Sequence, residues 1–224
     1  MTGEAAHHLA RVLRAEPGQM YELSDGKTVW LGRVQRVGRE QVEFVLVEQL
    51  DATVSRLRLT LLLAIVKFDR FEWALEKATE LGVGEIVPLA AARSDRGLLS
   101  AAAKRAHRWE KVLIESAQQS RRLAPPVLRP MTKPVQAFTA SSEGNCVAIL
   151  LSEGPDAPPL RTLLEGKRND AAVFAIGPEG GWTEEEFAAA RAAGFIEASL
   201  GPNILRTETA VAAALAIFNY VLGE

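Results

Sequence analysis

Apolar and polar residues alternate in short stretches through the first quarter of the chain. Met20–Leu23 and Thr28–Leu31 are two such stretches, and the turn sequence Ser24-Asp25-Gly26-Lys27 between them is typical of a β-hairpin. Similar segments follow at residues 33–37 and 41–48, with no helical pattern between them. Three or four consecutive strands of this kind predict a small β-barrel.

From Leu59 onward, apolar runs alternate with segments of helical periodicity. Five of these runs are predicted to be strands: Leu61–Val66, Ile86–Leu89, Cys146–Leu151, Ala172–Ile176 and Ala198–Leu200. A helical stripe follows the first strand, and Gly82 ends that helix as a C-terminal cap. Strands that alternate with helices predict an α/β domain whose mainly parallel sheet is covered on both faces. Such a sheet binds its ligands at the carboxyl ends of its strands.

Two longer helices are predicted in the same region. One extends from Ser100 to about Arg122, and the other begins at Thr207 near the end of the sequence. The second helix carries a strict apolar stripe, Val211, Leu215, Phe218 and Leu222. We expect the protein to be a homodimer, with Val211, Leu215 and Phe218 in or beside the interface.

The composition is that of an ordinary globular protein: of 224 residues, 48% are hydrophobic and 24% are charged. No window contains the ~18 consecutive apolar residues of a membrane span. The first ten residues lack the pattern of a secretory signal. The single Cys146 excludes an internal disulfide framework, and its apolar neighbours suggest a buried thiol on a strand. These features predict a cytoplasmic protein without membrane contact.

The net charge of −2 argues against a strongly basic surface that coats RNA. The type of cation is more informative, since 19 of the 26 basic residues are arginine. Arg105, Arg108, Arg121 and Arg122 lie close together in the sequence. A guanidinium binds phosphate through paired hydrogen bonds and stacks on bases, which an ammonium does poorly. For any single arginine, an arginine-rich composition without functional meaning explains its presence equally well.

Three loops at the ends of predicted strands are candidates for a ligand site: Leu151–Gly154, Gly177–Gly181 and Leu200–Arg206. In the middle loop, Gly180 and Gly181 permit a positive φ and let a ligand approach the backbone. The loop leads into a predicted capping box, Thr183 with Glu186, flanked by Trp182 and Phe187 at the two staple positions. The alternatives are a tight strand–helix turn and a phosphate-binding turn. Because Glu179 would repel an anion, a zwitterionic or cationic ligand suits the loop better.

Arg206 precedes the helix that Thr207 begins. A cation beside the positive end of a helix dipole is unfavourable unless a ligand or a carboxylate partners it. Local conflicts of this kind are expected at functional sites, so we predict a functional role for Arg206; the alternative is a solvated surface arginine.

These residues resemble a known family, the bacterial 16S ribosomal RNA uridine N3-methyltransferases of the SPOUT superfamily. The resemblance is carried by Ile176–Gly181 (IGPEGG) and Leu200–Ala210 (LGPNILRTETA), and by His7–Leu9, Arg11–Arg14, Lys77–Val83 and Gln119-Ser120 with Arg122. The motifs occur in the family's order and span nearly the whole chain. The chain departs from the family at Arg121, Gln118 and Asn203, where relatives usually carry Gly, Glu and Arg.

The resemblance implies a small PUA-like β-barrel over residues 1–57, followed by a trefoil-knotted SPOUT methyltransferase domain over residues 58–224 that dimerises. S-adenosyl-L-methionine is the implied cofactor, and no metal is expected. The implied cofactor-binding residues are Leu151, Ser152, Gly177, Gly180, Gly181, Leu200, Gly201, Ile204 and Leu205. The implied contacts with substrate RNA are His8, Arg11, Arg14, Arg93 and Arg122. The implied partner is 16S ribosomal RNA in an assembled small subunit.

The implied reaction methylates N3 of a uridine. N3 carries a proton and lies on the pairing edge, so the base must be unpaired or flipped out. We expect Arg206 to stabilise the anion that remains after the proton leaves, and Glu179 or Glu208 to accept the proton. Glu208 also suits the helix dipole without any catalytic role. The alternatives are a non-catalytic RNA-binding module and a SPOUT enzyme that acts on another RNA, such as transfer RNA ribose.

Overall fold

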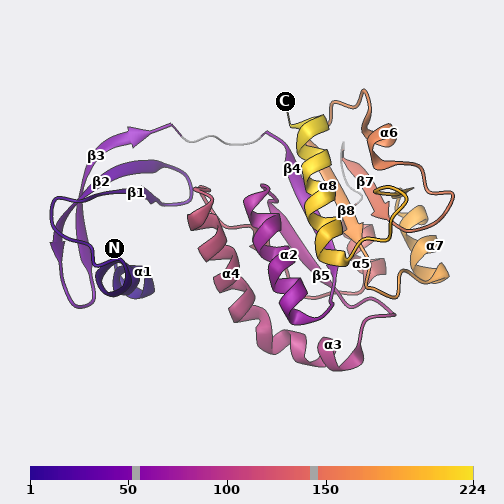
Figure 1. Cartoon of the computed structure of the whole chain (residues 1–224), viewed down its shortest axis with the longest axis horizontal. Coiled ribbons are helices and arrows are strands. Elements are labelled where there is room, and N and C mark those ends of the chain that lie inside the picture. Colours follow the sequence, from indigo (N-terminus) through magenta and orange to yellow (C-terminus); the bar gives the residue numbers. More distant parts are fainter. Residues whose placement is uncertain (52–55, 142–145, 224) are drawn as a thin grey trace. The chain divides into compact units, whose positions relative to one another are not determined.

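Figure 1 shows the computed structural model of the chain, which describes residues 1–51, 56–141 and 146–223. Internal contacts divide the chain into two units, Met1–Val54 and Ser55–Glu224. None of the helices in the described ranges has the length and apolar content of a transmembrane span.

The smaller unit contains the predicted hairpin and a third strand. Its elements are helix α1 (Gly3–His7), a π-helical turn (His8–Val12), and strands β1 (Met20–Ser24), β2 (Val29–Val37) and β3 (Val42–Leu50). The strands are antiparallel in the order β1-β2-β3. In the hairpin turn, the Asp25 carboxylate accepts hydrogen bonds from the backbone N–H groups of Lys27 (2.9 Å) and Thr28 (2.8 Å). These bonds explain why this turn sequence closes the hairpin.

The described part of this unit forms an open three-stranded sheet rather than a closed barrel. Three strands are too few to curve into closure, because barrel diameter grows with strand number. Helix α1 and the π-helical turn supply the core instead, with Ala6 and Leu9 packed against Val34 and Val42.

The larger unit contains the predicted parallel sheet. Its strands are β4 (Arg58–Ala64), β5 (Glu85–Leu89), β6 (Val127–Leu128), β7 (Val147–Leu151), β8 (Ala171–Ile176) and β9 (Ile196–Ala198). Their order is β6-β5-β4-β8-β7-β9, and every neighbouring pair is parallel. The prediction of an α/β domain with a mainly parallel sheet is confirmed. Each of the five predicted strands corresponds to an observed strand, with boundaries displaced by up to a few residues.

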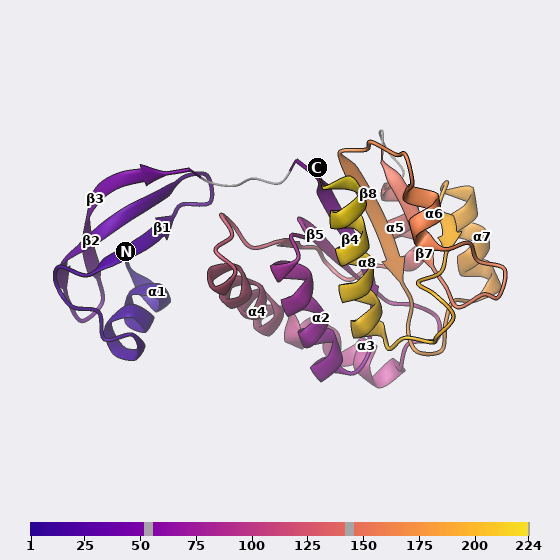
Figure 2. The same cartoon turned by 45° about the horizontal axis from the view of Figure 1, so that its top comes forward.

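Helices cover both faces of this sheet (Figures 1 and 2). They are α2 (Phe68–Glu80), α3 (Arg96–Ala102), α4 (Ala106–Gln119), α5 (Pro134–Ala140), α6 (Leu160–Leu164), α7 (Glu184–Ala192) and α8 (Thr207–Leu222). Strand β4 is apolar from Leu61 onward because both of its faces are buried. Leu61 and Leu63 belong to the core under α2, α4 and α8, whereas Leu62 belongs to the core under α5 and α7. A strand buried on both faces has no polar side.

One predicted helix differs from the structure, and one predicted helix end agrees with it. The long helix predicted from Ser100 to Arg122 is divided into α3, a 3-10 turn (Ala103–Arg105) and α4. The end of α4 places Arg121 at a φ of 55°, in the left-handed region that favours glycine. Gly82 has a φ of 89° after α2, which confirms its predicted role as a C-terminal cap.

The apolar stripe of α8 belongs to the protein's own core. Val211, Leu215 and Phe218 are each 0% exposed, and α8 lies beside α2 in both views (Figures 1 and 2). These three side chains therefore cannot form the surface of a dimer interface, and only their place beside such an interface stays a prediction. A stripe in the sequence shows that a face is covered, but the cover here is α2 and the sheet rather than a second copy of the chain.

The segment between β9 and α8 takes the chain back across the sheet. Strand β9 is at the edge beyond β7, whereas α8 packs against α2 and β8. The chain therefore returns past the carboxyl ends of β7 and β8 before α8 begins. This crossing brings the last of the three predicted loops next to the other two.

Candidate active site

The three predicted loops meet at the carboxyl edge of the sheet. The indole N–H of Trp182 donates to the Leu151 carbonyl (2.9 Å), which joins the loops that follow β8 and β7. The Ser152 N–H donates to the Ala198 carbonyl (3.0 Å), which joins the loop after β7 to β9. The Thr207 hydroxyl lies 3.5 Å from the Gly177 carbonyl oxygen. The structure thus brings together segments that are up to about fifty residues apart in the sequence.

Two glycines of the middle loop are tightly packed. A Cβ at Gly177 would lie 3.0 Å from the Trp182 ring, and a Cβ at Gly180 would lie 3.2 Å from the Cβ of Arg93. Gly181 has a φ of 70°, a conformation that costs other residues energy, and its added Cβ would meet only the Arg93 guanidinium, at 3.8 Å. The loop is thus held tightly on one side and leaves bare backbone on the other.

The capping box that follows this loop is confirmed. The Glu186 carboxylate accepts the Thr183 N–H (2.9 Å), and the Thr183 hydroxyl accepts the Glu186 N–H (3.2 Å). The other Glu186 oxygen accepts the N–H of Ala92, at 2.9 Å. A buried carboxylate therefore fixes both the start of α7 and the loop after β5, which orients the glycines.

The remaining residues of the expected cofactor set differ in exposure. Leu151 is buried, and Leu200 packs against the core. The Ser152 hydroxyl donates to the Glu197 carboxylate and accepts the Gly154 N–H (2.9 Å), so this side chain is already engaged. Ile204, by contrast, is 78% exposed. A large apolar side chain that is open at the site's edge is available to pack on a ligand.

The candidate catalytic carboxylates share an arginine that sequence reasoning missed. Arg70, in the first turn of α2, forms an ion pair with Glu179, and its Nε lies 3.9 Å from Glu208. Glu179 is 51% exposed, whereas Glu208 is 14% exposed and its Oε2 is buried with no hydrogen-bond partner in the described part of the chain. The position of Arg70 shortly after β4 could have indicated its place in the site, because the carboxyl end of β4 lies next to that of β8.

Arg206 occupies the N-cap position of α8 and its side chain is exposed. Within the ranges that the structure describes, its guanidinium has no ion-pair or hydrogen-bond partner. The conflict with the helix dipole predicted from the sequence is therefore present.

The expected RNA contacts lie in different places. In the larger unit, Arg93 donates to the Gly180 carbonyl (2.8 Å) and so belongs to the site. Arg122 is half-buried and donates to the Thr79 carbonyl at the end of α2 (2.8 Å); burial lowers the pKa of this guanidinium. In the smaller unit, His8, Arg11 and Arg14 are exposed on and just after the π-helical turn.

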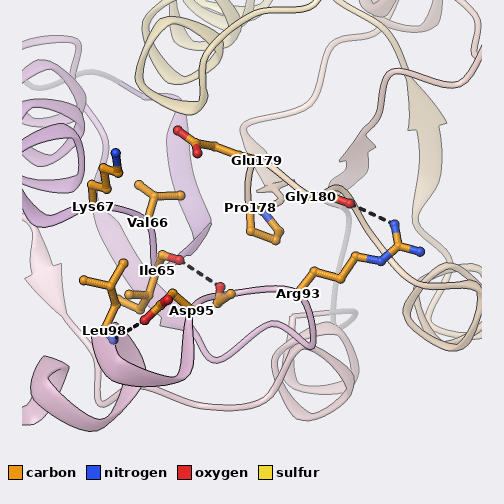
Figure 3. A pocket seen from close by; sticks show the side chains of 10 residues that line it. Ile65, Val66, Lys67, Arg93, Asp95, Leu98, Pro178, Glu179 and Gly180 are labelled. Atoms are coloured by element: carbon orange, nitrogen blue, oxygen red, sulfur yellow. Dashed lines mark hydrogen bonds between the residues drawn. The ribbon is translucent and has the colours of Figure 1, made fainter.

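A pocket of about 470 Å³ opens beside the middle loop (Figure 3). Its walls come from the segments that follow β4, β5 and β8. The apolar wall residues are Ile65, Val66, Leu98 and Pro178, and the polar ones are Lys67, Arg93, Ser94, Asp95 and Glu179, with Gly180 between them. No group of His, Cys, Asp or Glu among the described residues is arranged to hold a metal ion.

The fold and the site agree with two families of known domains. Residues 53–219 match the RNA methyltransferase domain, and residues 1–47 match the RNA methyltransferase PUA domain. The fold and these matches define the class: an RNA methyltransferase with an N-terminal PUA-like domain.

Individual relatives make the assignment more specific. The chain is 35% identical to a Synechocystis protein named ribosomal RNA small subunit methyltransferase E, over 99% of this chain and 73% of that one. A protein of the same name from Aquifex aeolicus is 31% identical, over 96% of this chain and 90% of that one. The chain belongs to the family of ribosomal RNA small subunit methyltransferases E.

Solved structures agree with this family. The chain matches methyltransferase E from Neisseria gonorrhoeae bound to S-adenosyl methionine with a TM-score of 0.90 and 32% identity, over 100% of this chain and 91% of that one. It matches a putative methyltransferase from Legionella pneumophila in complex with the same cofactor with a TM-score of 0.89 and 30% identity, over 100% and 92%. The resemblance seen in the sequence, including the SPOUT-type fold after a PUA-like domain, is confirmed.

Proposed function

We propose that the protein transfers the methyl group of S-adenosyl-L-methionine to N3 of a uridine in 16S ribosomal RNA, uracil-1498 by the family resemblance. The observation that carries the proposal is the meeting of three strand-ending loops, with bare glycine backbone, beside the cluster of Arg70, Glu179 and Glu208. The names of the relatives and the cofactor bound in the two similar structures support it.

The residues of the three loops fit this cofactor. Gly181 offers backbone that a side chain would cover, and the exposed Ile204 offers an apolar contact for an adenosine ring. The half-exposed carboxylate of Glu179, although paired with Arg70, suits a sulfonium better than a phosphate. When bound, the cofactor supplies an electrophilic methyl group. We assign its binding to Leu151, Ser152, Gly177, Gly180, Gly181, Leu200, Gly201, Ile204 and Leu205, with Ser152 acting through its backbone.

The chemical roles follow from exposure and charge. Glu179 is open to solvent, so we assign it as the acceptor of the N3 proton; the partly covered Glu208 keeps Arg70 in place from the other side. The free guanidinium of Arg206 then stabilises the negative charge that spreads over the two carbonyl oxygens of the base. Alignment of the base, the proton acceptor and the methyl group supplies much of the rate.

The rest of the assignment concerns partners. We propose that residues 1–57 and the side chains of His8, Arg11, Arg14, Arg93 and Arg122 bind the RNA, and that residues 58–224 form the methyltransferase domain. We further propose a homodimer, cytoplasmic localisation, and the assembled small subunit as substrate. An interface on α8 would use its outer face, where Tyr220 is 87% exposed.

The test is methylation of assembled small subunits and of naked 16S RNA with labelled cofactor, followed by nucleoside analysis. We expect labelled 3-methyluridine, formed faster on the assembled subunit. Label in a ribose-methylated nucleotide would refute the base assignment. Cofactor binding without transfer to either substrate would favour a non-catalytic module.

A further inference from the structure

The pocket in Figure 3 contains a cation to which the proposed function gives no role. Lys67 lies at the N-cap position of α2, directly after the segment that follows β4. Its side chain has no hydrogen-bond or ion-pair partner in the described ranges of the chain. It lines the same pocket as Glu179.

Three other polar side chains of the pocket each make a hydrogen bond to the backbone. The Ser94 hydroxyl donates to the Ile65 carbonyl (2.8 Å), and the Asp95 carboxylate accepts the Leu98 N–H (2.9 Å). Arg93 donates to the Gly180 carbonyl. Lys67 is thus the polar side chain of the pocket that has no partner in the described ranges, and the Glu179 carboxylate, although paired with Arg70, is 51% exposed. Between them lie apolar walls that a flat ring can contact.

This arrangement matches the pairing edge of uracil. That edge presents a carbonyl oxygen, the N3–H donor and a second carbonyl oxygen. Glu179 can accept the N3–H while Lys67 donates to a neighbouring carbonyl. Cytosine has no proton on N3 and carries an amino donor in place of O4, so the same two groups would face mismatched atoms. The pocket chemistry thus selects uracil over cytosine.

The position of the pocket suits transfer from the adjoining loop. Gly180 lines the pocket and belongs to the loop to which we assign the cofactor. A pocket of about 470 Å³ is in the size range of small-ligand sites and has room for a nucleotide.

We propose that this pocket holds the flipped-out target uracil and that Lys67 is a catalytic residue, whose ammonium donates to a ring carbonyl and stabilises the N3 anion. The inference rests on the proposed function. The N3–H bond breaks, its proton goes to Glu179 and its electron pair remains on the base. That pair forms the bond from N3 to the methyl carbon, while the electron pair of the carbon–sulfur bond leaves with sulfur. Lys67 keeps its protons throughout.

The test compares Lys67→Met and Lys67→Arg with Lys111→Met, a matched change at an exposed lysine of α4. Cofactor affinity is measured by calorimetry. Single-turnover methylation is measured on small subunits that contain uracil or 5-fluorouracil, as a function of pH. Fluorine withdraws electrons and makes N3 easier to ionise, so it replaces part of the help that Lys67 gives.

We expect Lys67→Met to keep the wild-type cofactor affinity and to lower the single-turnover rate by ~100-fold, the scale of losing one charge-stabilising donor. The single-turnover rate of Lys67→Met should increase with pH over a range that lies higher than the range for the wild type. The difference in rate between this variant and the wild type should be smaller on 5-fluorouracil RNA. Lys67→Arg should recover part of the rate, and Lys111→Met should behave as wild type.

Three results would overturn the inference. Loss of cofactor affinity in Lys67→Met would make the pocket part of the cofactor site. An equal deficit on both RNAs, with an unshifted pH profile, would assign Lys67 to the RNA backbone. An unchanged rate would remove it from the site. Failure of the wild-type protein to form 3-methyluridine on either RNA would refute the proposed function itself.

Discussion

Replacing Gly181 by valine tests the cofactor site with a matched control elsewhere in the same unit. Gly181 and Gly82 both have a positive φ, 70° and 89°. A Cβ at Gly181 would lie 3.8 Å from the Arg93 guanidinium, an ordinary contact, and a Cβ at Gly82 would meet nothing within 4 Å. Both substitutions therefore strain the backbone, and in neither does the added Cβ clash with a neighbour. They differ in place: Gly181 is in the loop assigned to the cofactor, and Gly82 ends α2.

The strain should be similar for the two variants. A left-handed conformation costs a residue with a side chain about 1–2 kcal/mol, so each variant should unfold with that much less free energy. For a protein of this size, each kcal/mol lowers Tm by roughly 2–4 °C. Thermal unfolding measured by circular dichroism should show two folded proteins with comparable losses.

Cofactor affinity should separate the two variants. Calorimetry of Gly82→Val should give the wild-type Kd. Gly181→Val places two methyl groups over the backbone that we assign to the cofactor, and we expect its binding to fall below detection, a loss of at least about 2.8 kcal/mol or ~100-fold. Wild-type-like affinity in Gly181→Val would refute the site, and equal losses in both variants would assign the effect to strain.

Three further predictions follow from single features. Arg206→Ala should leave cofactor affinity unchanged and lower the single-turnover rate by ~100-fold. Arg206→Lys should recover little of the rate, because an ammonium lacks the planar fork of a guanidinium. Near-normal affinity and rate in Arg206→Ala would contradict the proposed stabilisation of the base anion. Burial raises the pKa of the Cys146 thiol, so at pH 8 it should react with a disulfide reagent more slowly than a free thiol does, and an equal rate would contradict this. Light scattering at micromolar concentration should give the mass of a dimer; a monomer would refute the proposed assembly.

The elements of the larger unit were predictable because their signals are local. A parallel strand buried on both faces is an uninterrupted apolar run; β7 and β8 are such runs, and β4 is one from Leu61 onward. The capping box of Thr183 and Glu186 is likewise specified within four residues. By contrast, the division of the predicted long helix at Ala103–Arg105 lies among residues that all tolerate an α-helix.

The partners of the site residues were less predictable, because they depend on which strands are neighbours. Arg70 and Glu179 are 109 positions apart, and only the pairing of β4 with β8 brings them together. The second contact of Glu186, with Ala92, depends in the same way on the loop after β5. The stripe of α8 was recognised as a covered face, but the sequence does not state what covers it.

The packing of α8 against α2 makes the site a late product of folding. The Asn219 amide donates to the Leu81 carbonyl across 138 positions of sequence (2.7 Å), and α8 supplies Val211, Leu215 and Phe218 to the same core as α2. Contacts of such long sequence separation form slowly, because the loop between them must be ordered first. Until α8 docks, Glu208 and Arg206 are absent from the site and the loops that follow β7 and β8 have no third wall. A chain whose first strands and helices are already assembled therefore carries Lys67 and Arg70 but still lacks Arg206, Glu208 and the loop that leads into α8. If the proposed roles of these residues hold, activity appears only when the fold is complete.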